Sequence, residues 1–215
     1  MTNESQLTEV EAVILDYGEV LCHRPSPEEV GRLATVFELT PESFRDRWDR
    51  SRAPYDRGVI SPEVYWLQFA AEANASITAT QIELIRRLEV TMWSNVNPAM
   101  VRWSRQLNDA GIKTALLSNM HADLVHHVRT LDWVQAFTVK TFSAEVGLVK
   151  PDAAIYEHTL RELGMSPERT VFVDDREPNI RAARSLGICA IQFRSVEQLH
   201  NDLTGLGLSH LPKES

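Results

Sequence analysis

The stretch AVILD, residues 12–16, is a short apolar run that ends in a carboxylate. Two later stretches follow the same plan: TALLSN, residues 114–119, ends in a hydroxyl and an amide, and TVFVDD, residues 170–175, ends in two carboxylates. Short apolar runs separated by helix-like segments are typical of parallel strands buried on both faces. Because open parallel sheets bind ligands at the carboxyl ends of their strands, we expect these polar ends to meet at one sheet edge, together with Lys150.

The composition allows one sizeable core. The chain has 215 residues, of which 43% are hydrophobic and 24% charged, enough for one core and a smaller inserted unit. Its formal net charge of −8, without a dense run of Lys or Arg, argues against nucleic acid or an anionic membrane as the main partner. We therefore expect a globular protein with a small-molecule partner; the sequence does not decide between a monomer and a dimer.

The first residues of the chain and its two cysteines bear on the cellular location. Residues 1–11 are polar and acidic, without the features of a targeting signal, and no apolar run approaches the roughly 20 residues that span a bilayer. Cys22 and Cys189 are too few for a disulfide framework and lack metal-ligand spacing, so we expect reduced thiols. These features predict a cytoplasmic protein.

Residues 26–97 contain helix signals and no convincing strand. Ser26, Thr40 and Ser61 each precede a Pro-Glu pair, which is typical of the first turn of a helix. Residues 79–93 carry apolar side chains at helical spacing. The segment therefore predicts about four helices that form a bundle.

Beyond this segment, strands and helices alternate, which predicts an α/β fold with a parallel five-stranded sheet. We expect a core formed by residues 1–22 and 97–215 and a helical insertion formed by residues 23–96. Besides the first strand, the expected strands cover residues 112–117, 138–142, 170–173 and 188–193, and the expected helices residues 98–111, 122–131, 153–163 and 179–186. Residues 205–215 are expected to be loosely ordered.

Four motifs occur in order along the chain, and their order carries a resemblance. They are ILDYGEVL (residues 14–21), LLSN (116–119), GLVKPD (147–152) followed by IY (155–156), and VFVDD (171–175) followed by NI (179–180). The set resembles the motifs of the haloacid dehalogenase (HAD) superfamily of phosphohydrolases, in the subgroup with a helical cap after the first strand. The resemblance covers nearly the whole chain and implies a Rossmann-like core with the insertion as its cap.

The residue types suit phosphoryl transfer. A carboxylate such as Asp16 can attack phosphorus and form an aspartyl phosphate, which water then hydrolyses. Nucleophile and substrate are both anionic, so cations must neutralise the transferring oxygens, and Lys150 can supply one positive charge. Asp16, Asp174 and Asp175 together would need a hard cation, for which Mg²⁺ is the candidate. A separation above about 10 Å between Asp16 and the acidic pair would exclude a shared ion.

The resemblance implies further roles. The backbone carbonyl of Gly18 would join the three carboxylates as a metal ligand, and Ser118 and Asn119 would hydrogen-bond the phosphoryl oxygens. Taken singly, these residues also have ordinary readings, as turn residues or helix caps, and Lys150 as a solvated amine. Their joint order favours a site.

Gly18 departs from the pattern of the family's phosphatases, which usually carry a second Asp two positions after the nucleophile as general acid and base. Glycine cannot transfer a proton, so help worth roughly 10²–10⁴ in rate must come from elsewhere or be unnecessary. Three interpretations stay open. The leaving group needs little protonation, as in an anomeric sugar, acyl or aryl phosphate; Glu19, His23 or a cap residue replaces the acid; or the site mainly binds. Relatives with glycine here include sugar-1-phosphate phosphatases.

We therefore expect a Mg²⁺-dependent phosphohydrolase that acts on a small phosphorylated metabolite, with sugar phosphates among the candidates. One alternative is a 2-haloacid dehalogenase, although Asp174 and Asp175 would repel a carboxylate substrate. The other alternative, motivated by Gly18, is a weakly catalytic module that binds a phosphorylated metabolite.

Residues outside the motifs receive structural interpretations. We expect the five tryptophans to anchor the core or an interface, and His121, His126 and His127 to lie on a solvated helix face. For four candidate residues of the pocket wall we favour surface or packing roles: Arg45, Arg52, Tyr55 and Trp66.

Overall fold

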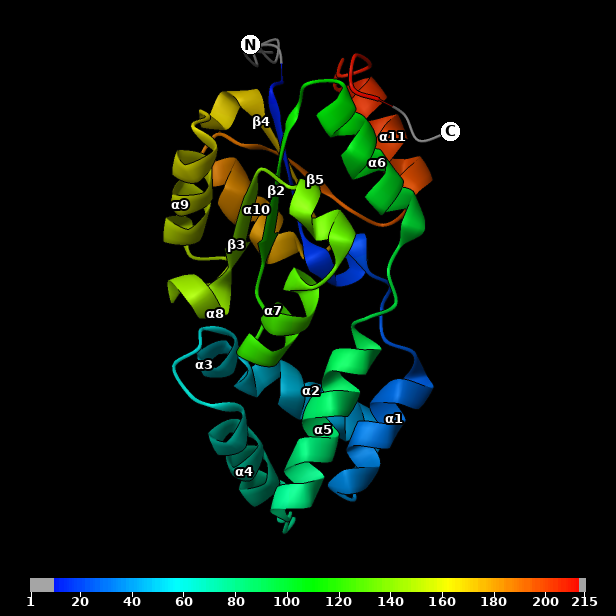
Figure 1. The fold of residues 1–215 in the computed structure, drawn as a ribbon, viewed down its shortest axis with the longest axis vertical. Helices are drawn as coiled ribbons and strands as arrows, with labels where there is room; N and C mark the ends of the chain where they lie inside the picture. The colour runs from blue at the N-terminus through cyan, green and yellow to red at the C-terminus, as the bar shows by residue number, and fades with distance from the viewer. Residues whose placement is uncertain (1–9, 213–215) are drawn as a thin grey trace.

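The computed structural model describes residues 10–212 of the chain (Figure 1). Its centre is a five-stranded sheet with the order β3-β2-β1-β4-β5, in which every neighbouring pair of strands is parallel. This confirms the predicted α/β fold. The strands are β1 (Ala12–Leu15), β2 (Lys113–Ser118), β3 (Val139–Phe142), β4 (Thr170–Asp174) and β5 (Cys189–Gln192).

Helices cover both faces of the sheet because successive strand residues point to opposite sides. They are α6 (Pro98–Asp109), α7 (Ala122–Arg129), α8 (Ser143–Val146), α9 (Ala153–Leu163), α10 (Glu177–Ser185) and α11 (Val196–Gly205). Val13 and Leu15 of β1 share a cluster with residues of α6, α7 and α11, whereas Ala12 and Ile14 share one with residues of α9 and α10. Burial on both faces explains why the strands are apolar without alternation.

Between β1 and β2 the chain forms a separate group of helices, which we call the helical insert, residues 27–92 (bottom of Figure 1). It comprises α1 (Pro27–Val36), α2 (Pro41–Ser51), α3 (Ala53–Asp56), α4 (Pro62–Glu72) and α5 (Ala79–Met92). Its side chains form their own cluster, in which Phe37, Phe44 and Trp66 are fully buried. The short α3 was not predicted, because four residues are too few to show a periodic pattern.

The predicted helix starts are confirmed by their hydrogen bonds. The side chains of Ser26, Thr40, Ser61 and Asn97 each accept a bond from the backbone N–H three residues later. Proline follows each of them, where its fixed φ suits the first turn and its missing N–H costs no bond. Each cap contributes about 1 kcal/mol to stability.

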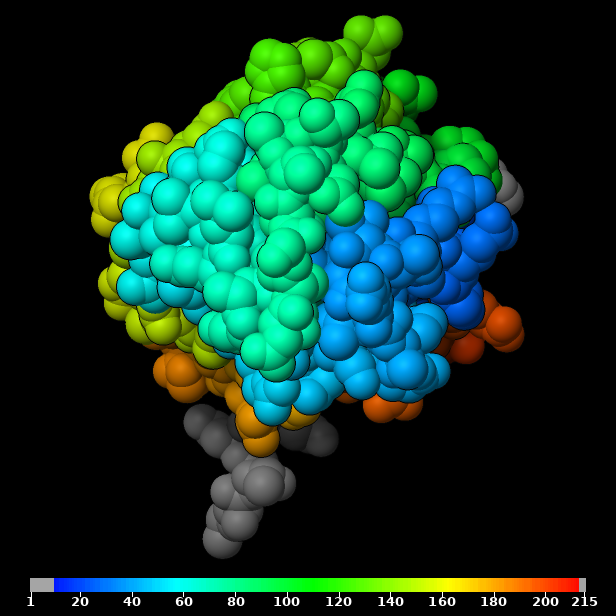
Figure 2. Space-filling view, turned by 90° about the horizontal axis from the view of Figure 1, so that it is seen from below, coloured from blue at the N-terminus to red at the C-terminus, as the bar shows by residue number. Residues whose placement is uncertain are grey.

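Two connections join the helical insert to the sheet, and they run side by side. Cys22 and Val96 form an antiparallel bridge, and the backbone N–H of His23 donates to the carbonyl of Asn95 at 2.7 Å. The insert therefore leaves and rejoins the core at one place. From the end that carries it, the insert covers most of the molecule, with core residues visible around its rim (Figure 2).

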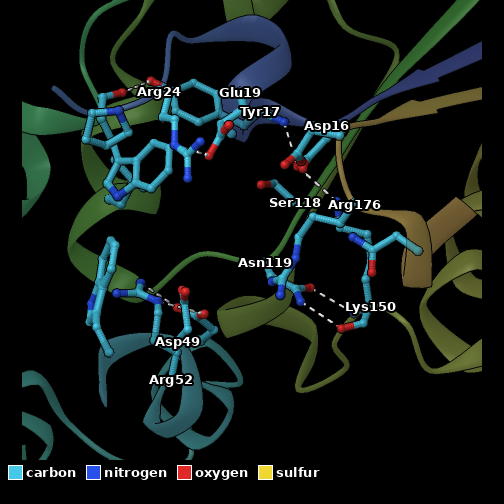
Figure 3. Close-up of a pocket in the computed structure, with 18 of the residues that line it drawn as sticks. Asp16, Tyr17, Glu19, Arg24, Asp49, Arg52, Ser118, Asn119, Lys150 and Arg176 are labelled. Carbon is cyan, nitrogen blue, oxygen red and sulfur yellow. Dashed lines mark hydrogen bonds and ion pairs between the residues drawn. The ribbon is translucent and has the colours of Figure 1, made fainter. Parts of the chain in front are cut away.

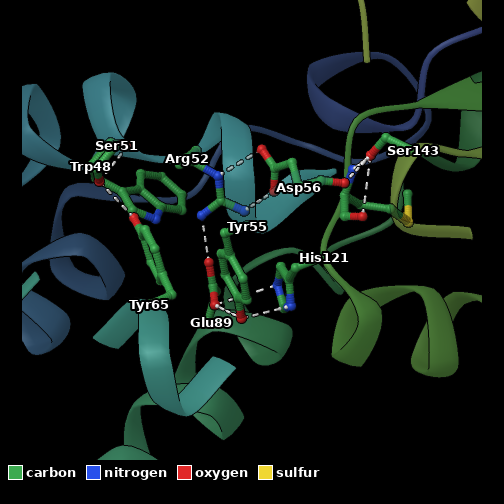
Figure 4. A network of polar contacts seen from close by, with 10 residues as sticks. Trp48, Ser51, Arg52, Tyr55, Asp56, Tyr65, Glu89, His121 and Ser143 are labelled. Carbon is green, nitrogen blue, oxygen red and sulfur yellow. Dashed lines mark hydrogen bonds and ion pairs between the residues drawn. The ribbon is translucent and has the colours of Figure 1, made fainter. Parts of the chain in front are cut away.

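A buried polar cluster also links the insert to the core (Figure 4). The Tyr55 hydroxyl of α3 lies 2.9 Å from Nδ1 of His121, the two rings stack at 4.6 Å, and the same hydroxyl donates to Glu89 of α5. Arg52 donates to Glu89 at 2.5 Å. His121 is fully buried, so the expectation of a solvated position is wrong for this residue. The insert packs over the start of α7 and covers it.

The C-terminal segment differs from the sequence expectation. Leu203 of α11 and the following Leu208 and Leu211 are each at most 3% exposed, so the described part of this segment packs on the core. Residues 1–9 and 213–215 lie outside the described residues, and most of the expectation about a targeting signal falls there. No helix in the described range is long and apolar enough to cross a membrane.

Candidate active site

The carboxyl ends of β1, β2 and β4 lie next to one another at one edge of the sheet. Leu15 pairs in register with Leu116 of β2 and Val173 of β4, and the backbone N–H of Asp16 donates to the carbonyl of Val173 at 3.0 Å. This register brings Asp16 beside the acidic pair that ends β4. Chain segments more than 150 residues apart therefore meet because parallel strands end at the same edge.

Three carboxylates come together there. One oxygen from each of Asp16, Asp174 and Asp175 lies within 4.8 Å of the others. This separation is well below the limit of about 10 Å that would exclude a shared ion. Carboxylate oxygens are the ligands that Mg²⁺ prefers, so the donor set fits a hard divalent cation.

Lys150 inserts its amine between two of these carboxylates. Its Nζ lies 2.9 Å from Oδ1 of Asp16 and 2.6 Å from Oδ2 of Asp174, and it also donates to the carbonyl of Leu117 at 3.0 Å. Burial lowers the pKa of Lys150, but the two carboxylates outweigh burial and raise it overall. The amine is therefore a fixed positive charge and not the solvated amine of the alternative reading.

The two acids of the pair differ in their surroundings. The Asp174 carboxylate accepts bonds from Lys150 and from the backbone N–H of Arg176, and the Asn179 amide nitrogen donates to both of its oxygens. The Asp175 carboxylate accepts no hydrogen bond from any residue between 10 and 212. Asp174 therefore positions Lys150, whereas Asp175 keeps its oxygens free for a ligand. Asn179, seen in sequence only as part of a motif, supplies two of these bonds.

Burial, together with like charges nearby, raises the pKa of two of the three carboxylates. Burial raises the pKa of Asp16 to about 6, and the Asp174 charge adds to this rise, while Lys150 and the Ser118 hydroxyl oppose it. Burial raises the pKa of Asp175 to about 7, and Asp16 and Asp174 raise it further. The single charge of Lys150 thus does not balance the cluster, and a further cation would relieve it.

Ser118 and Asn119 follow β2 into the same site (Figure 3). Ser118 is 3% exposed and lines the cavity. The Asn119 amide donates to the carbonyl of Lys150 and accepts from its N–H, both at 2.8 Å. Asn119 thus clamps the backbone that carries the buried amine. Its expected contact with a phosphoryl group stays a prediction.

Gly18 lies on the cavity wall with φ −63° and ψ 130°, a conformation open to any residue. A Cβ built there would lie 3.6 Å from the Trp93 ring, an ordinary contact. Neither the backbone conformation nor the available space requires glycine at position 18. The absence of a carboxylic acid there therefore affects the chemistry of the site and not its packing. Of the candidates to replace that acid, Glu19 lines the cavity and pairs with Arg24, whereas His23 is exposed and outside the wall.

The site opens into a cavity of about 450 Å³ between the core and the helical insert. Of the four candidate wall residues named from the sequence, Arg45 and Arg52 line the cavity, whereas Tyr55 and Trp66 are buried and do not line it. The other residues that the insert and its connections contribute to the wall are Arg24, Pro25, Trp48, Asp49, Ala53, Asp56 and Trp93. The insert thus supplies mostly arginine, acidic and tryptophan side chains.

Comparison with known proteins identifies the family. The profile of the haloacid dehalogenase-like hydrolases matches residues 10–187. The chain belongs to this family. It is therefore a hydrolase, and the matched range contains all four motifs recognised in the sequence.

Among curated proteins, the chain resembles the sesquiterpene phosphatase astK of Aspergillus oryzae, with 27% identity over 141 residues, 65% of this chain and 70% of that protein. It is also 33% identical over 209 residues to acyl-CoA dehydrogenase family member 10 of Mus musculus, covering 91% of this chain but only 19% of the mouse protein. The chain thus has a phosphatase among its relatives and corresponds to a small part of the longer mouse protein.

Solved structures share the fold. A HAD family enzyme of Bacteroides thetaiotaomicron, determined as an Asp-to-Ala mutant in complex with magnesium and inorganic phosphate, superposes with a TM-score of 0.70. The two are 18% identical, and the match covers 86% of this chain and 94% of that one. At this identity the likeness establishes the fold alone.

Proposed function

We propose that the protein is a Mg²⁺-dependent phosphohydrolase that acts on a small phosphorylated metabolite through an aspartyl-phosphate intermediate. The observation that carries the proposal is the buried amine of Lys150 placed between Asp16 and Asp174 at the floor of a cavity. The phosphatase among the curated relatives supports it. We further propose that residues 23–96 form a cap over this site. We also propose that the protein is cytoplasmic.

Asp16, Asp174, Asp175 and the backbone carbonyl of Gly18 would hold the metal. Three crowded carboxylates, of which Asp16 and Asp175 have raised pKa values, are suited to a divalent cation, which, when bound, neutralises charge on the phosphoryl oxygens. Because Asp174 already accepts four hydrogen bonds, Asp16 and Asp175 offer the freer oxygens.

In the proposed reaction, an oxygen of Asp16 bonds to phosphorus while the bond from phosphorus to the leaving oxygen breaks, and that oxygen takes the electron pair. Water then attacks phosphorus, which releases phosphate and restores the Asp16 carboxylate. Lys150 holds positive charge beside the reacting oxygens in both steps. Ser118, at the same strand end, is placed to donate a hydrogen bond to the phosphoryl group.

The glycine at position 18 bears on which leaving groups the site favours. Without an acid at that position, leaving groups that are stable as anions, or anomeric sugar phosphates, are favoured over simple alkyl phosphates. Sugar phosphates therefore stay among the candidate substrates, together with acyl and aryl phosphates.

The test is phosphate release from a panel of sugar, acyl and aryl phosphates, with Mg²⁺ and after removal of metal with a chelator. Activity should depend on added Mg²⁺, and Asp16→Asn should lower kcat by on the order of 10⁴-fold or more while its far-UV circular dichroism spectrum matches that of the unmodified protein. Full activity of Asp16→Asn would exclude Asp16 as the nucleophile. The same preparation separates the alternatives. Chelator-resistant chloride release from a 2-haloacid would indicate a dehalogenase, and calorimetric binding of a phosphorylated metabolite without phosphate release would indicate a binding module.

A further inference from the structure

One face of α2 is turned toward the cavity. The cavity is lined by Arg45, Trp48 and Asp49 of this helix and by Arg52 just beyond its end. The last three follow Arg45 by three, four and seven residues, which places all four on one side of the helix. Figure 3 shows Asp49 and Arg52 across the cavity from Asp16. This face therefore meets the part of a substrate that points away from the reacting phosphoryl group.

Arg45 is the unusual member of this face. It is half-buried and forms no ion pair or hydrogen bond with any residue in the described range. The neighbouring arginines, Arg47 and Arg50 of α2 and Arg52 just beyond its end, each lie within 3.6 Å of a carboxylate oxygen. Asp49, one turn further along the same face, makes no ion pair with Arg45.

Scarcity of carboxylates does not explain the free guanidinium. The chain has 30 Asp and Glu residues against 22 Lys and Arg, so a partner for each arginine is available in excess. A half-buried cation without a partner has lost part of its hydration and received no compensating bond. An anion that enters the cavity would supply that bond, and a guanidinium is suited to hold a carboxylate or a phosphate through two N–H donors.

The neighbouring wall is aromatic. The Arg52 guanidinium covers the Trp48 ring at 4.4 Å, and Trp93 lies 6.2 Å from that ring. Arg52 is held by two carboxylates and is thus not free for a ligand. A substrate in the cavity would therefore also meet the side chains of two tryptophans.

We propose that the leaving group of the substrate carries a second anionic group, a carboxylate or a phosphate, that binds Arg45. This inference rests on the proposed phosphatase function and names its substrate class: an organic phosphate with a second negative charge on its far side. Lys150 binds the transferring phosphoryl group on the core side, whereas Arg45 binds the other end of the substrate.

Three probes with the same ring test the inference: phenyl phosphate, para-carboxyphenyl phosphate and para-phenylene bisphosphate. The unmodified enzyme should prefer the two probes with a second anion. Arg45→Ala should raise KM for these two by about tenfold or more and change phenyl phosphate by less than about twofold, because only they lose a charge-assisted hydrogen bond. Comparison of the carboxylate and bisphosphate probes shows which anion the site accepts better.

Arg50→Ala is the matched control, because Arg50 lies on the same helix, exposed and paired with Asp46. It should leave all three probes unchanged, and Arg45→Lys should recover part of the affinity. Equal effects of Arg45→Ala on all three probes, no effect on any, or no preference of the unmodified enzyme would overturn the inference. If no probe is hydrolysed, the wider panel of sugar and acyl phosphates decides the phosphatase proposal separately. Calorimetric binding of the same probes to the unmodified protein and to Arg45→Ala then still decides the role of Arg45.

Discussion

The core and the helical insert present different kinds of charge to the cavity between them. On the core side, Lys150 and Asp174 are held by several partners each and cannot turn toward another group without losing buried bonds. On the insert side, Arg45 has no partner within the described part of the chain. The core side therefore offers one fixed position that suits a phosphoryl group, whereas the insert side leaves one cation available to another part of a ligand.

The interiors differ in a related way. The sheet is packed mostly with aliphatic residues on both faces, whereas the insert is built around aromatic rings, with the Phe37 and Phe69 ring centroids 4.7 Å apart. Part of this aromatic interior, Trp48 and Trp93, reaches the cavity wall. The insert therefore brings its own packing chemistry to the site.

The largest effect is expected on the core side. Lys150→Met should lower kcat/KM by about 10²- to 10³-fold, because the positive charge beside the reacting oxygens is lost. It should also reduce the free energy of unfolding by about 3 kcal/mol, because Asp16 and Asp174 are left buried without their cation. Lys113→Met, at the exposed start of β2, is the control and should leave kcat/KM unchanged. Kinetics and urea unfolding measure both effects, and a fully active Lys150→Met would remove Lys150 from the mechanism.

A smaller effect is expected where core and insert touch, at Gly18. Gly18→Asp adds an acid in a position that the backbone and Trp93 tolerate. It should raise the rate for alkyl phosphates relative to aryl phosphates by about tenfold, a part of the benefit that general acids provide. Gly18→Asn, similar in shape but without the proton, should leave the ratio of the two rates unchanged. A ratio that stays constant in Gly18→Asp would mean that another group, with Glu19 the first to test, already protonates the leaving oxygen.

The smallest effect concerns the buried cluster that joins the two regions. Burial lowers the pKa of His121 below its ordinary value near 6.5, although Glu89 opposes this. The folded protein thus keeps the imidazole neutral, while the unfolded chain binds a proton below that pH. Stability from this residue is complete above the ordinary pKa and falls as the pH drops below it.

Urea unfolding at pH 7.5 and 5.5 tests the direction of this pH dependence of stability. The unmodified protein should lose more stability between the two values than His121→Gln does. His126→Gln, at an exposed position on α7, should behave like the unmodified protein. Equal losses in all three proteins would show that His121 does not contribute to the pH dependence.

Much of the site could be predicted because it is built from strand ends. Apolar runs with polar ends identified Asp16, Ser118 and the acidic pair at 174–175, since parallel strands of one sheet end at one edge. The helix starts were predictable for a similar reason, because caps and first-turn prolines act through bonds within four residues.

Other features depend on contacts that no local pattern records. The burial of His121 arises from the insert packing over α7, and the packing of Leu208 and Leu211 arises from the core cluster beside α11. The Asn119 clamp on Lys150 and the four bonds to Asp174 likewise join residues from different elements. Each residue type alone is compatible with a surface position.

Periodicity, helix caps and strand ends are local properties of the chain, so they were enough to predict the parallel sheet, the helical insertion and the candidate nucleophile. Contacts between distant segments decide which acid already accepts several hydrogen bonds and which is free, that Trp93 lies against Gly18, and that Arg45 lines the cavity without a partner among residues 10–212. The physical reason is that charge pairing and burial depend on distances between segments far apart in the chain, and folding alone sets those distances.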